Sequence, residues 1–223
     1  MCGRFLLHAP VEALQRAFGF AERPNLRPRY NIAPMQTVAI VRHKDDGGGR
    51  ELALVRWGLI PSWAKDASIG NKLINARAET VAEKPAFRGA FRRRRALVPA
   101  DGFYEWRKRE GGGPKQPLLI RRRDGEPFAF AGLWERWRGP EGGVETCTIL
   151  ATEANAVLAP IHGRMPVILD SAAYDRWLDP ALPGAEELLR PCPDEWFEAF
   201  PVGKQVNDVR NDAAELITPM NSA

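Results

Sequence analysis

The sequence predicts a single α+β domain, residues 1–223, built around β-strands. Apolar runs too short for most helices recur along the chain, and clusters of Gly, Pro and Asp separate them. Hydrophobic residues make up 44% of the 223 positions, which is enough for a substantial core and excludes intrinsic disorder. The sequence shows neither repeats nor a low-complexity linker, so one domain is the simplest interpretation.

The elements expected from periodicity follow in chain order. Val11–Phe18 places apolar side chains on one helical face and predicts a helix, whereas residues 21–34, rich in Pro, Arg and Asn, predict a loop. The apolar runs 37–41 and 52–57 flank the glycine-rich stretch 45–49 and predict a hairpin. Further strands are expected at 96–99, 102–107, 117–121, 128–133, 146–151 and 167–169. Residues 171–178 predict a helix capped by Asp170 or Ser171, 186–190 predict a helical turn, and the polar stretch after Val206 shows no pattern.

Composition excludes several classes of protein. The formal net charge is +4, and no apolar run approaches the roughly 20 residues of a membrane helix. The first residues lack the apolar core of a secretory signal. Three cysteines cannot all pair, and none forms a Cys-x-x-Cys motif, which argues against a disulfide scaffold and a structural zinc site. We therefore expect a cytoplasmic monomer (nucleoid-associated if bacterial) without metal, cofactor or membrane contact.

Cys2 is the first residue with chemical potential. Loss of Met1 would leave a cysteine with a free α-amino group, and the amine and thiol together condense with aldehydes to a thiazolidine. The same residue could act as an N-terminal nucleophile, with the thiolate attacking and the amine as base. Arg4 would favour the thiolate. A chance cysteine in a frayed terminus is the alternative.

A polar segment lies at residues 74–80. If it is extended, Asn75, Arg77 and Glu79 share one face. Such a face could orient a carbonyl and bind a phosphate or carboxylate, or it could be the solvated side of an edge strand.

Glu105 and His162 are candidates for proton transfer. Glu105 lies within an apolar strand, where alternation places it with Phe103 and opposite Tyr104 and Trp106. Half-burial would raise the pKa of its carboxyl group towards the range of general acid–base catalysis. His162 enters an apolar strand beside a glycine and an arginine, and imidazole exchanges protons near neutral pH. A surface ion pair and a surface histidine are the respective alternatives.

The arginine run 92–95 is the densest cluster of charge. Most such runs are solvated surface, yet DNA binding gains affinity from arginine–phosphate contacts and from aromatic side chains that stack on unpaired bases.

These segments, taken in order, resemble the SRAP family (SOS-response-associated peptidase), whose members crosslink to abasic sites in DNA. The matching blocks are residues 1–5, 29–34, 57–63, 74–80, 99–106, 131–135, 152–155 and 161–166, with a further match near 206–207 and 214–217. Any one block would be weak, but eight in the expected order are specific.

The resemblance implies a β-rich, barrel-like and mostly antiparallel core with a few peripheral helices and a basic groove for single-stranded DNA. It implies that Cys2 forms a thiazolidine with the ring-opened abasic sugar and shields the lesion during repair. By motif position, Asn75 orients the amine or the sugar, Glu105 is the general acid/base, and His162 assists ring opening or reversal of the link. The DNA-binding positions implied are Arg4, Asn31, Pro34, Trp63, Arg77 and Arg164. Ala64 stands where the family can carry a second tryptophan, which implies a narrower wedge between the DNA strands.

Two other functions remain open at this level. An N-terminal-nucleophile amidohydrolase or peptidase would use Cys2 on an amide carbonyl, and self-cleavage after Met1 is one form of it. A non-catalytic single-strand DNA-binding module would leave Cys2 incidental.

Overall fold

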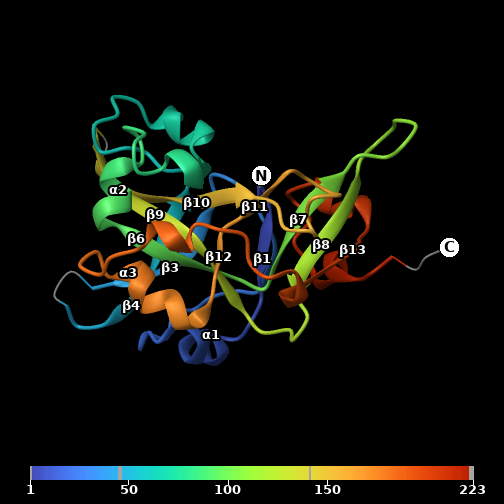
Figure 1. The fold of residues 1–223 in the computed structure, drawn as a ribbon, viewed down its shortest axis with the longest axis horizontal. Helices are drawn as coiled ribbons and strands as arrows, with labels where there is room; N and C mark the ends of the chain where they lie inside the picture. Colours follow the sequence, from blue (N-terminus) through green and yellow to red (C-terminus); the bar gives the residue numbers. More distant parts are fainter. Residues whose placement is uncertain (1, 45–46, 141, 221–223) are drawn as a thin grey trace.

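Strands form most of the regular structure (Figure 1). The computed structural model describes residues 2–44, 47–140 and 142–220. The strands are β1 Phe5–Leu7, β2 Arg29–Ile32, β3 Thr37–His43, β4 Arg50–Trp57, β5 Asn75–Arg77, β6 Arg95–Ala100, β7 Gly102–Arg107, β8 Gln116–Arg122, β9 Phe128–Gly139, β10 Gly142–Glu153, β11 Arg164–Pro166, β12 Ile168–Leu169 and β13 Phe197–Pro201. The α-helices are α1 Val11–Phe18, α2 Arg88–Arg93 and α3 Tyr174–Leu178, and short 3₁₀ turns join several elements.

Five of the strands close into a barrel. Its order is β10–β4–β3–β6–β9, and β9 pairs again with β10 to complete the ring. All of these pairings are antiparallel except that of β4 with β10, which is parallel. The prediction of an α+β fold with a barrel-like, mostly antiparallel core is therefore confirmed.

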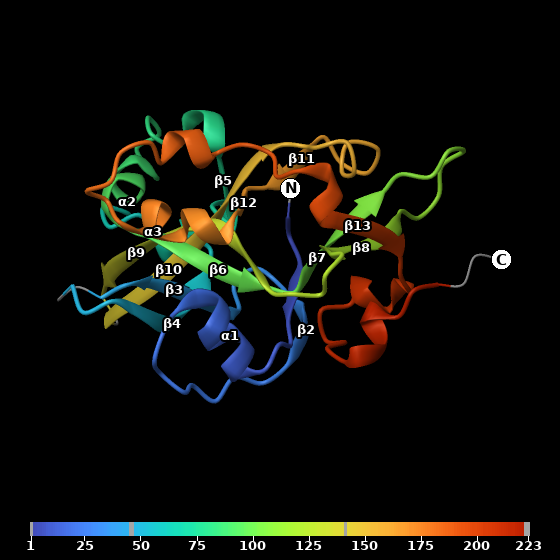
Figure 2. The ribbon, with the colours of Figure 1, turned by 60° about the horizontal axis from the view of Figure 1, so that its bottom comes forward.

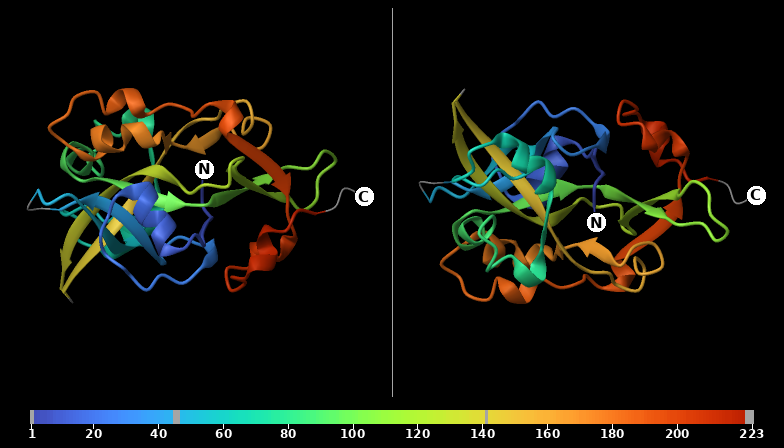
Figure 3. Two further views of the ribbon diagram at one scale, coloured as in Figure 1. Left: turned by 90° about the horizontal axis from the view of Figure 1, so that it is seen from below. Right: turned by 90° about the horizontal axis from the view of Figure 1, so that it is seen from above.

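A second, antiparallel sheet lies beside the barrel in the order β13–β8–β7–β1–β2. The start of the chain lies where this sheet meets the barrel, in every view (Figures 2 and 3). Alternation along β1 sends Phe5 into the main core and Leu6 into a smaller cluster on the other face of the sheet. Val206 and Leu216 cover that smaller cluster, so the C-terminal segment packs against the outer face of the sheet.

Most of the predicted elements are confirmed. The helix Val11–Phe18 has the expected bounds, and Gly19 ends it in the left-handed conformation at φ 71°. The runs 37–41 and 52–57 pair as the expected hairpin, of whose turn residues 45–46 lie outside the described part of the chain. The side chain of Asp170 caps the helical segment that begins at Ser171.

Other expectations were wrong or incomplete. The loop predicted at 21–34 contains strand β2, which pairs with β1. The two strands are far apart in the sequence, so the local composition of 21–34 does not reveal this pairing. Residues 75–77 are a strand, but 78–80 form a 3₁₀ turn, so Glu79 does not share a strand face with Asn75. The sequence indicated neither β13 nor the short helix α2 within the arginine-rich stretch.

A close backbone contact explains the glycine that follows β4. Gly58 adopts φ 131°, and a Cβ there would lie 2.8 Å from the carbonyl oxygen of Gly70. The Gly58 amide donates to the carbonyl of Cys147 in β10, at 2.8 Å. Glycine is therefore the residue best suited to position 58, where the segment from Gly58 to Trp63 begins.

Among the described residues, no helix is long and apolar enough to cross a membrane.

Candidate functional site

Cys2 is fully buried just before β1, the strand that pairs with β2 and β7 in the second sheet. It precedes β1, and the carbonyl of Arg4 accepts a hydrogen bond from the amide of Tyr104 at 2.9 Å, which extends the pairing with β7 towards the chain start. Burial, and next to it the charge of Glu105, raise the pKa of the Cys2 thiol to about 12. The thiol is therefore protonated at neutral pH in this environment.

Glu105 reaches the same point from β7. Phe103 packs in the main core, whereas Tyr104 and Trp106 belong to the cluster on the opposite face, so the predicted alternation is confirmed. Glu105 is only 4% exposed, and its charge acts on the Cys2 thiol. The structure thus brings a carboxylate and the candidate nucleophile together.

Asn75 holds Cys2 from the barrel side. Strand β5 pairs in parallel with β10, and the indole of Trp57 donates to the carbonyl of Ile74 at 2.8 Å, which anchors the start of β5. From there the Asn75 amide nitrogen donates to the Cys2 carbonyl at 2.8 Å. Its other atom, Oδ1, is buried and has no hydrogen-bond partner among the described residues. That oxygen is suited to accept a hydrogen bond from an amine or a hydroxyl group.

His162 precedes β11, which pairs with residues 151–153 of β10, next to residues 149–151 that pair with β5. The backbone amide of Arg164 lies 3.0 Å from His162 Nδ1 and donates to it in the tautomer that carries its proton on Nε2. The carbonyl of Arg164 lies 3.1 Å from the same Nδ1 and accepts a hydrogen bond in the tautomer that carries its proton on Nδ1. The backbone of Arg164 can therefore hold the His162 ring in either tautomer.

Glu105 and His162 line the same pocket, which has a volume of about 440 Å³. Its lining residues are Arg4, Glu105, Trp106, Lys115, His162 and Asn207. Arg4, Glu105 and His162 were predicted site residues. Lys115 and Asn207 were not; Asn207 accepts from the Trp106 indole at 2.7 Å. Lys115 follows a glycine-rich turn, and nothing in the local pattern marks it.

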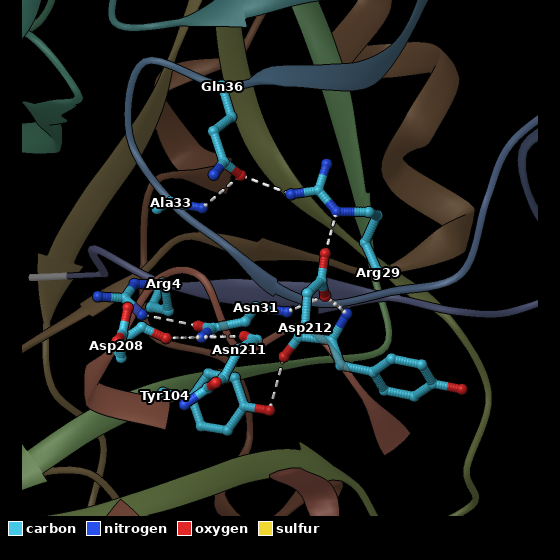
Figure 4. Close-up of polar contacts among 10 residues, drawn as sticks. Arg4, Arg29, Asn31, Ala33, Gln36, Tyr104, Asp208, Asn211 and Asp212 are labelled. Atoms are coloured by element: carbon cyan, nitrogen blue, oxygen red, sulfur yellow. Dashed lines mark hydrogen bonds and ion pairs between the residues drawn. The ribbon is translucent and has the colours of Figure 1, made fainter. Parts of the chain in front are cut away.

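Arg4 is held by the C-terminal segment (Figure 4). Its guanidinium donates to Asn31 Oδ1 at 2.7 Å and to the Val206 carbonyl at 2.8 Å, and it lies over the Trp106 ring at 5.7 Å. Asn31 is fully buried, and its amide nitrogen donates to the carbonyls of Val206, Asp208 and Asn211. Direct DNA contact by Asn31 stays a prediction, and these contacts favour a positioning role for it.

Arg164 and Arg77 lie on the two strands that flank β10. Arg164 forms two hydrogen bonds with Glu79, at 2.9 and 3.1 Å, and its guanidinium also donates to the carbonyl of Ala151. The Arg164 hydrogen bonds are the largest cause that lowers the pKa of the Glu79 carboxyl group, and Arg77 also contributes. Arg77 is exposed. The Arg164 guanidinium, which was predicted to bind phosphate, is therefore paired with the Glu79 carboxylate.

Pro34 and Trp63 lie outside this network. The Trp63 side chain is 60% exposed, and its indole nitrogen donates to the carbonyl of Pro85 at 3.3 Å. Pro34 is partly buried in the turn that follows β2. Within the described residues neither forms a hydrogen bond with Cys2, Asn75 or His162.

The remaining cysteines and the last residue of the arginine run are buried. Cys147 is buried in the core, and Cys192 is buried in a loop. Arg95 is also buried, and its guanidinium donates to the carbonyls of Phe91, Trp177 and Asp179. The described residues contain no group of His, Cys, Asp and Glu side chains that could hold a metal ion.

The arrangement suits covalent chemistry with a carbonyl compound. Asn75 holds the backbone of Cys2 in place, and the charge of the buried Glu105 acts on the Cys2 thiol. Glu105 and His162 line one pocket, and the basic side chains of Arg4 and Lys115 border it.

Comparison with known proteins gives consistent matches. A family model described as SOS response associated peptidase (SRAP) matches residues 1–209. The chain is 42% identical to the abasic site processing protein YoqW of Bacillus subtilis, over 97% of this chain and 99% of that protein. It is 33% identical to the abasic site processing protein HMCES of Gallus gallus, over 99% of this chain and 78% of that protein. A crystal structure of a protein from Bacteroides thetaiotaomicron matches with a TM-score of 0.86 at 28% identity, covering 98% of this chain and all of the other.

Proposed function

The chain belongs to the SOS response associated peptidase (SRAP) family, and from that premise we propose that it processes abasic sites in DNA by forming a covalent link through Cys2. The observation that carries the proposal is the hydrogen bond from Asn75 to the Cys2 carbonyl, which holds the cysteine beside Glu105. The names of the relatives support the substrate.

The link requires Cys2 to be the first residue. Only after Met1 is removed does Cys2 carry a free α-amino group, which has a pKa of roughly 7.7–8.0 in model peptides. The amine is then partly unprotonated at neutral pH, whereas burial, and next to it the charge of Glu105, hold the pKa of the thiol above its usual range. This difference favours attack by the amine before attack by sulfur.

The steps follow from this order. An abasic deoxyribose is mostly a closed hemiacetal, and ring opening needs one group to protonate the ring oxygen and another to take the hydroxyl proton. His162 Nε2–H and the Glu105 carboxylate supply these two roles. The amine adds to the aldehyde and water leaves, which gives an imine. The thiol then adds across the C=N bond: sulfur bonds to carbon, and the thiol proton passes to nitrogen, by way of Glu105, to give the thiazolidine.

DNA binding is independent of base sequence in this proposal, because the lesion has no base. Arg4, Arg77 and Arg164 contact phosphates, while Pro34 and Trp63 contact the DNA that flanks the lesion. Asn31 contributes by holding Arg4 in place. We propose that the chain acts in the cytoplasm as a monomer, on single-stranded DNA, with residues 1–223 as one domain.

One experiment tests the covalent link. The purified protein is incubated with single-stranded DNA that carries one abasic site, and the products are separated on a denaturing gel. Wild type and the matched control Cys192→Ala should give a shifted band, and Cys2→Ala should give none. A wild type without a shift, or a shift that survives in Cys2→Ala, contradicts the proposal.

A second variant tests the role of the carboxylate. Glu105→Gln should slow the crosslink while DNA affinity stays close to that of wild type, because the pocket keeps its shape and loses only the proton acceptor. A large loss of affinity would instead assign Glu105 a structural role. An N-terminal-nucleophile peptidase, including one that removes Met1 itself, would need a Cys2 thiolate, and the raised pKa of the thiol disfavours it.

A further inference from the structure

A second pocket, of about 450 Å³, lies away from the Cys2 site and is lined mainly by arginine. Its residues are Ser62, Arg93, Arg94, Trp134, Arg136 and Arg138. We refer to them as the arginine pocket. It lies between the end of α2, strand β9 and the segment after β4, and Figure 1 shows that segment beside α2.

The fold brings these arginines together from two elements. Alternation along β9 puts Trp134, Arg136 and Arg138 on one face, and α2 ends at Arg93 against it. Arg94 lies over the Trp134 ring at 5.8 Å, so the aromatic residue helps to hold the cluster.

The positive charge of the arginine pocket is only partly balanced. Arg94 pairs with Glu135 at 3.2 Å, and Arg136 pairs with Glu145 at 2.7 Å. Arg93 and Arg138 are exposed, and neither has a carboxylate partner among residues 2–44, 47–140 and 142–220. Like charges held close together repel, so an anion that enters the arginine pocket relieves this repulsion.

The wall of the arginine pocket indicates which anion fits. Ser62 lines it, and the next residue is Trp63, whose exposed ring is held by the carbonyl of Pro85. On the other side of the segment, the Trp137 indole donates to the Ala64 carbonyl at 2.7 Å. A fixed aromatic side chain next to unpaired arginines is the combination that binds single-stranded nucleic acid, because the ring stacks on a base and guanidinium groups hold the phosphates.

We propose that the arginine pocket binds backbone phosphates of the DNA strand whose abasic site lies at Cys2, so that the strand extends past Trp63 onto Arg93 and Arg138. The inference rests on the proposed function and adds a phosphate-binding surface outside the lesion pocket. Its contribution is to affinity and not to the chemistry at Cys2.

The test compares two double variants that lose the same charge. Arg93→Gln/Arg138→Gln alters the arginine pocket, and Arg16→Gln/Arg27→Gln alters two exposed arginines of α1 and the following loop. Binding to undamaged single-stranded oligonucleotides of about 20 and about 5 nucleotides is measured by fluorescence anisotropy over a range of salt concentrations.

The pocket variant should bind the long oligonucleotide about tenfold more weakly, with a salt slope smaller by roughly 0.7 for each phosphate that it no longer binds. It should bind the short one like wild type, and at saturating DNA it should still crosslink an abasic site. The control variant should resemble wild type in every measurement. Equal losses in both variants would attribute the effect to net charge and overturn the proposal, as would no loss in either.

A third arm separates a DNA strand from a small anion. Inorganic phosphate is added at constant ionic strength. If it abolishes the difference between the pocket variant and wild type at low millimolar concentration, the arginine pocket is a small-anion site and the strand proposal is wrong. A failure of the Cys2 crosslink in wild type refutes the proposed function instead, and the anisotropy measurements with undamaged DNA remain interpretable.

Discussion

Replacement of Asn75 by alanine tests the frame that holds Cys2. The Asn75 amide donates at 2.8 Å to the carbonyl of a residue with no exposed surface. Without that donor the carbonyl stays buried and unpaired, at a cost of about 1–3 kcal/mol. For a domain of this size each kcal/mol lowers Tm by roughly 2–4 °C, so Tm should fall by roughly 2–12 °C.

The effect on the reaction should be larger than the effect on stability. A displacement of the nucleophile by about 1 Å can lower a rate by about 100-fold, and Asn75 is the side chain that fixes the Cys2 backbone from the barrel. We therefore expect the single-turnover crosslinking rate of Asn75→Ala to fall between about 10- and 100-fold at saturating DNA. The affinity for DNA should change little, since Asn75 does not line the basic pocket.

Two further variants make this expectation specific. Asn75→Asp keeps the shape of the side chain but removes the donor, and it should react at least as slowly as Asn75→Ala. Asn71→Ala removes an amide whose contact with Arg56 is long, at 3.5 Å and on the surface, and it should react like wild type. If Asn75→Asp crosslinks at the wild-type rate, or if the slowing of Asn75→Ala matches its unfolded fraction, the positioning role is refuted.

Three other predictions use the same fold. In a chain that keeps a residue before Cys2, the thiol has a pKa of about 12, so the thiolate at pH 7 is on the order of 10³-fold rarer than in an ordinary cysteine. Alkylation of Cys2, measured by mass spectrometry, should therefore be slow and accelerate about tenfold per pH unit. A fast reaction at pH 7 would contradict the argument that burial raises the pKa. Gly58→Ala should lower the free energy of unfolding by about 2 kcal/mol or more, because Gly58 has a φ of 131° and its Cβ would meet the Gly70 carbonyl oxygen. Gly89→Ala should not lower it, because the space around its Cβ is open. Unfolding by denaturant measures both values. Glu79→Gln removes the carboxylate bound to Arg164. It should raise DNA affinity about two- to fivefold, which corresponds to the free energy of an exposed ion pair. Unchanged or weaker binding, measured by fluorescence anisotropy, would show that Arg164 does not exchange Glu79 for a phosphate.

Local pattern was sufficient for the elements whose stabilising contacts are local. The helix Val11–Phe18 has its apolar face and its terminal glycine within nine residues, and only a short glycine-rich stretch separates the two apolar runs of the hairpin. The face of Glu105 also followed from alternation alone. Such features depend on a residue and its close neighbours, so the sequence displays them directly.

Long-range contacts account for most of what was missed. Strand β2 is polar and follows a proline, so its sequence predicts a loop; its pairing with β1 makes it a strand. The backbone amide of Asn31 in β2 donates to the carboxylate of Asp212, 181 residues away. No periodicity links such positions, and for the same reason Lys115 gave no signal although it lines the pocket.

The position of Cys2 shows why these distant contacts matter for function. Chain ends usually fray, and a nucleophile at a frayed end would react without a defined geometry. Here β1 lies between β7 and β2, so the first residues are held by hydrogen bonds on both sides. Strand β2 is in turn held by the C-terminal segment through Asn31 and Asp212. The end of the chain therefore stabilises its beginning, and substitutions at Asp212 should slow the reaction at Cys2 without any contact with the substrate.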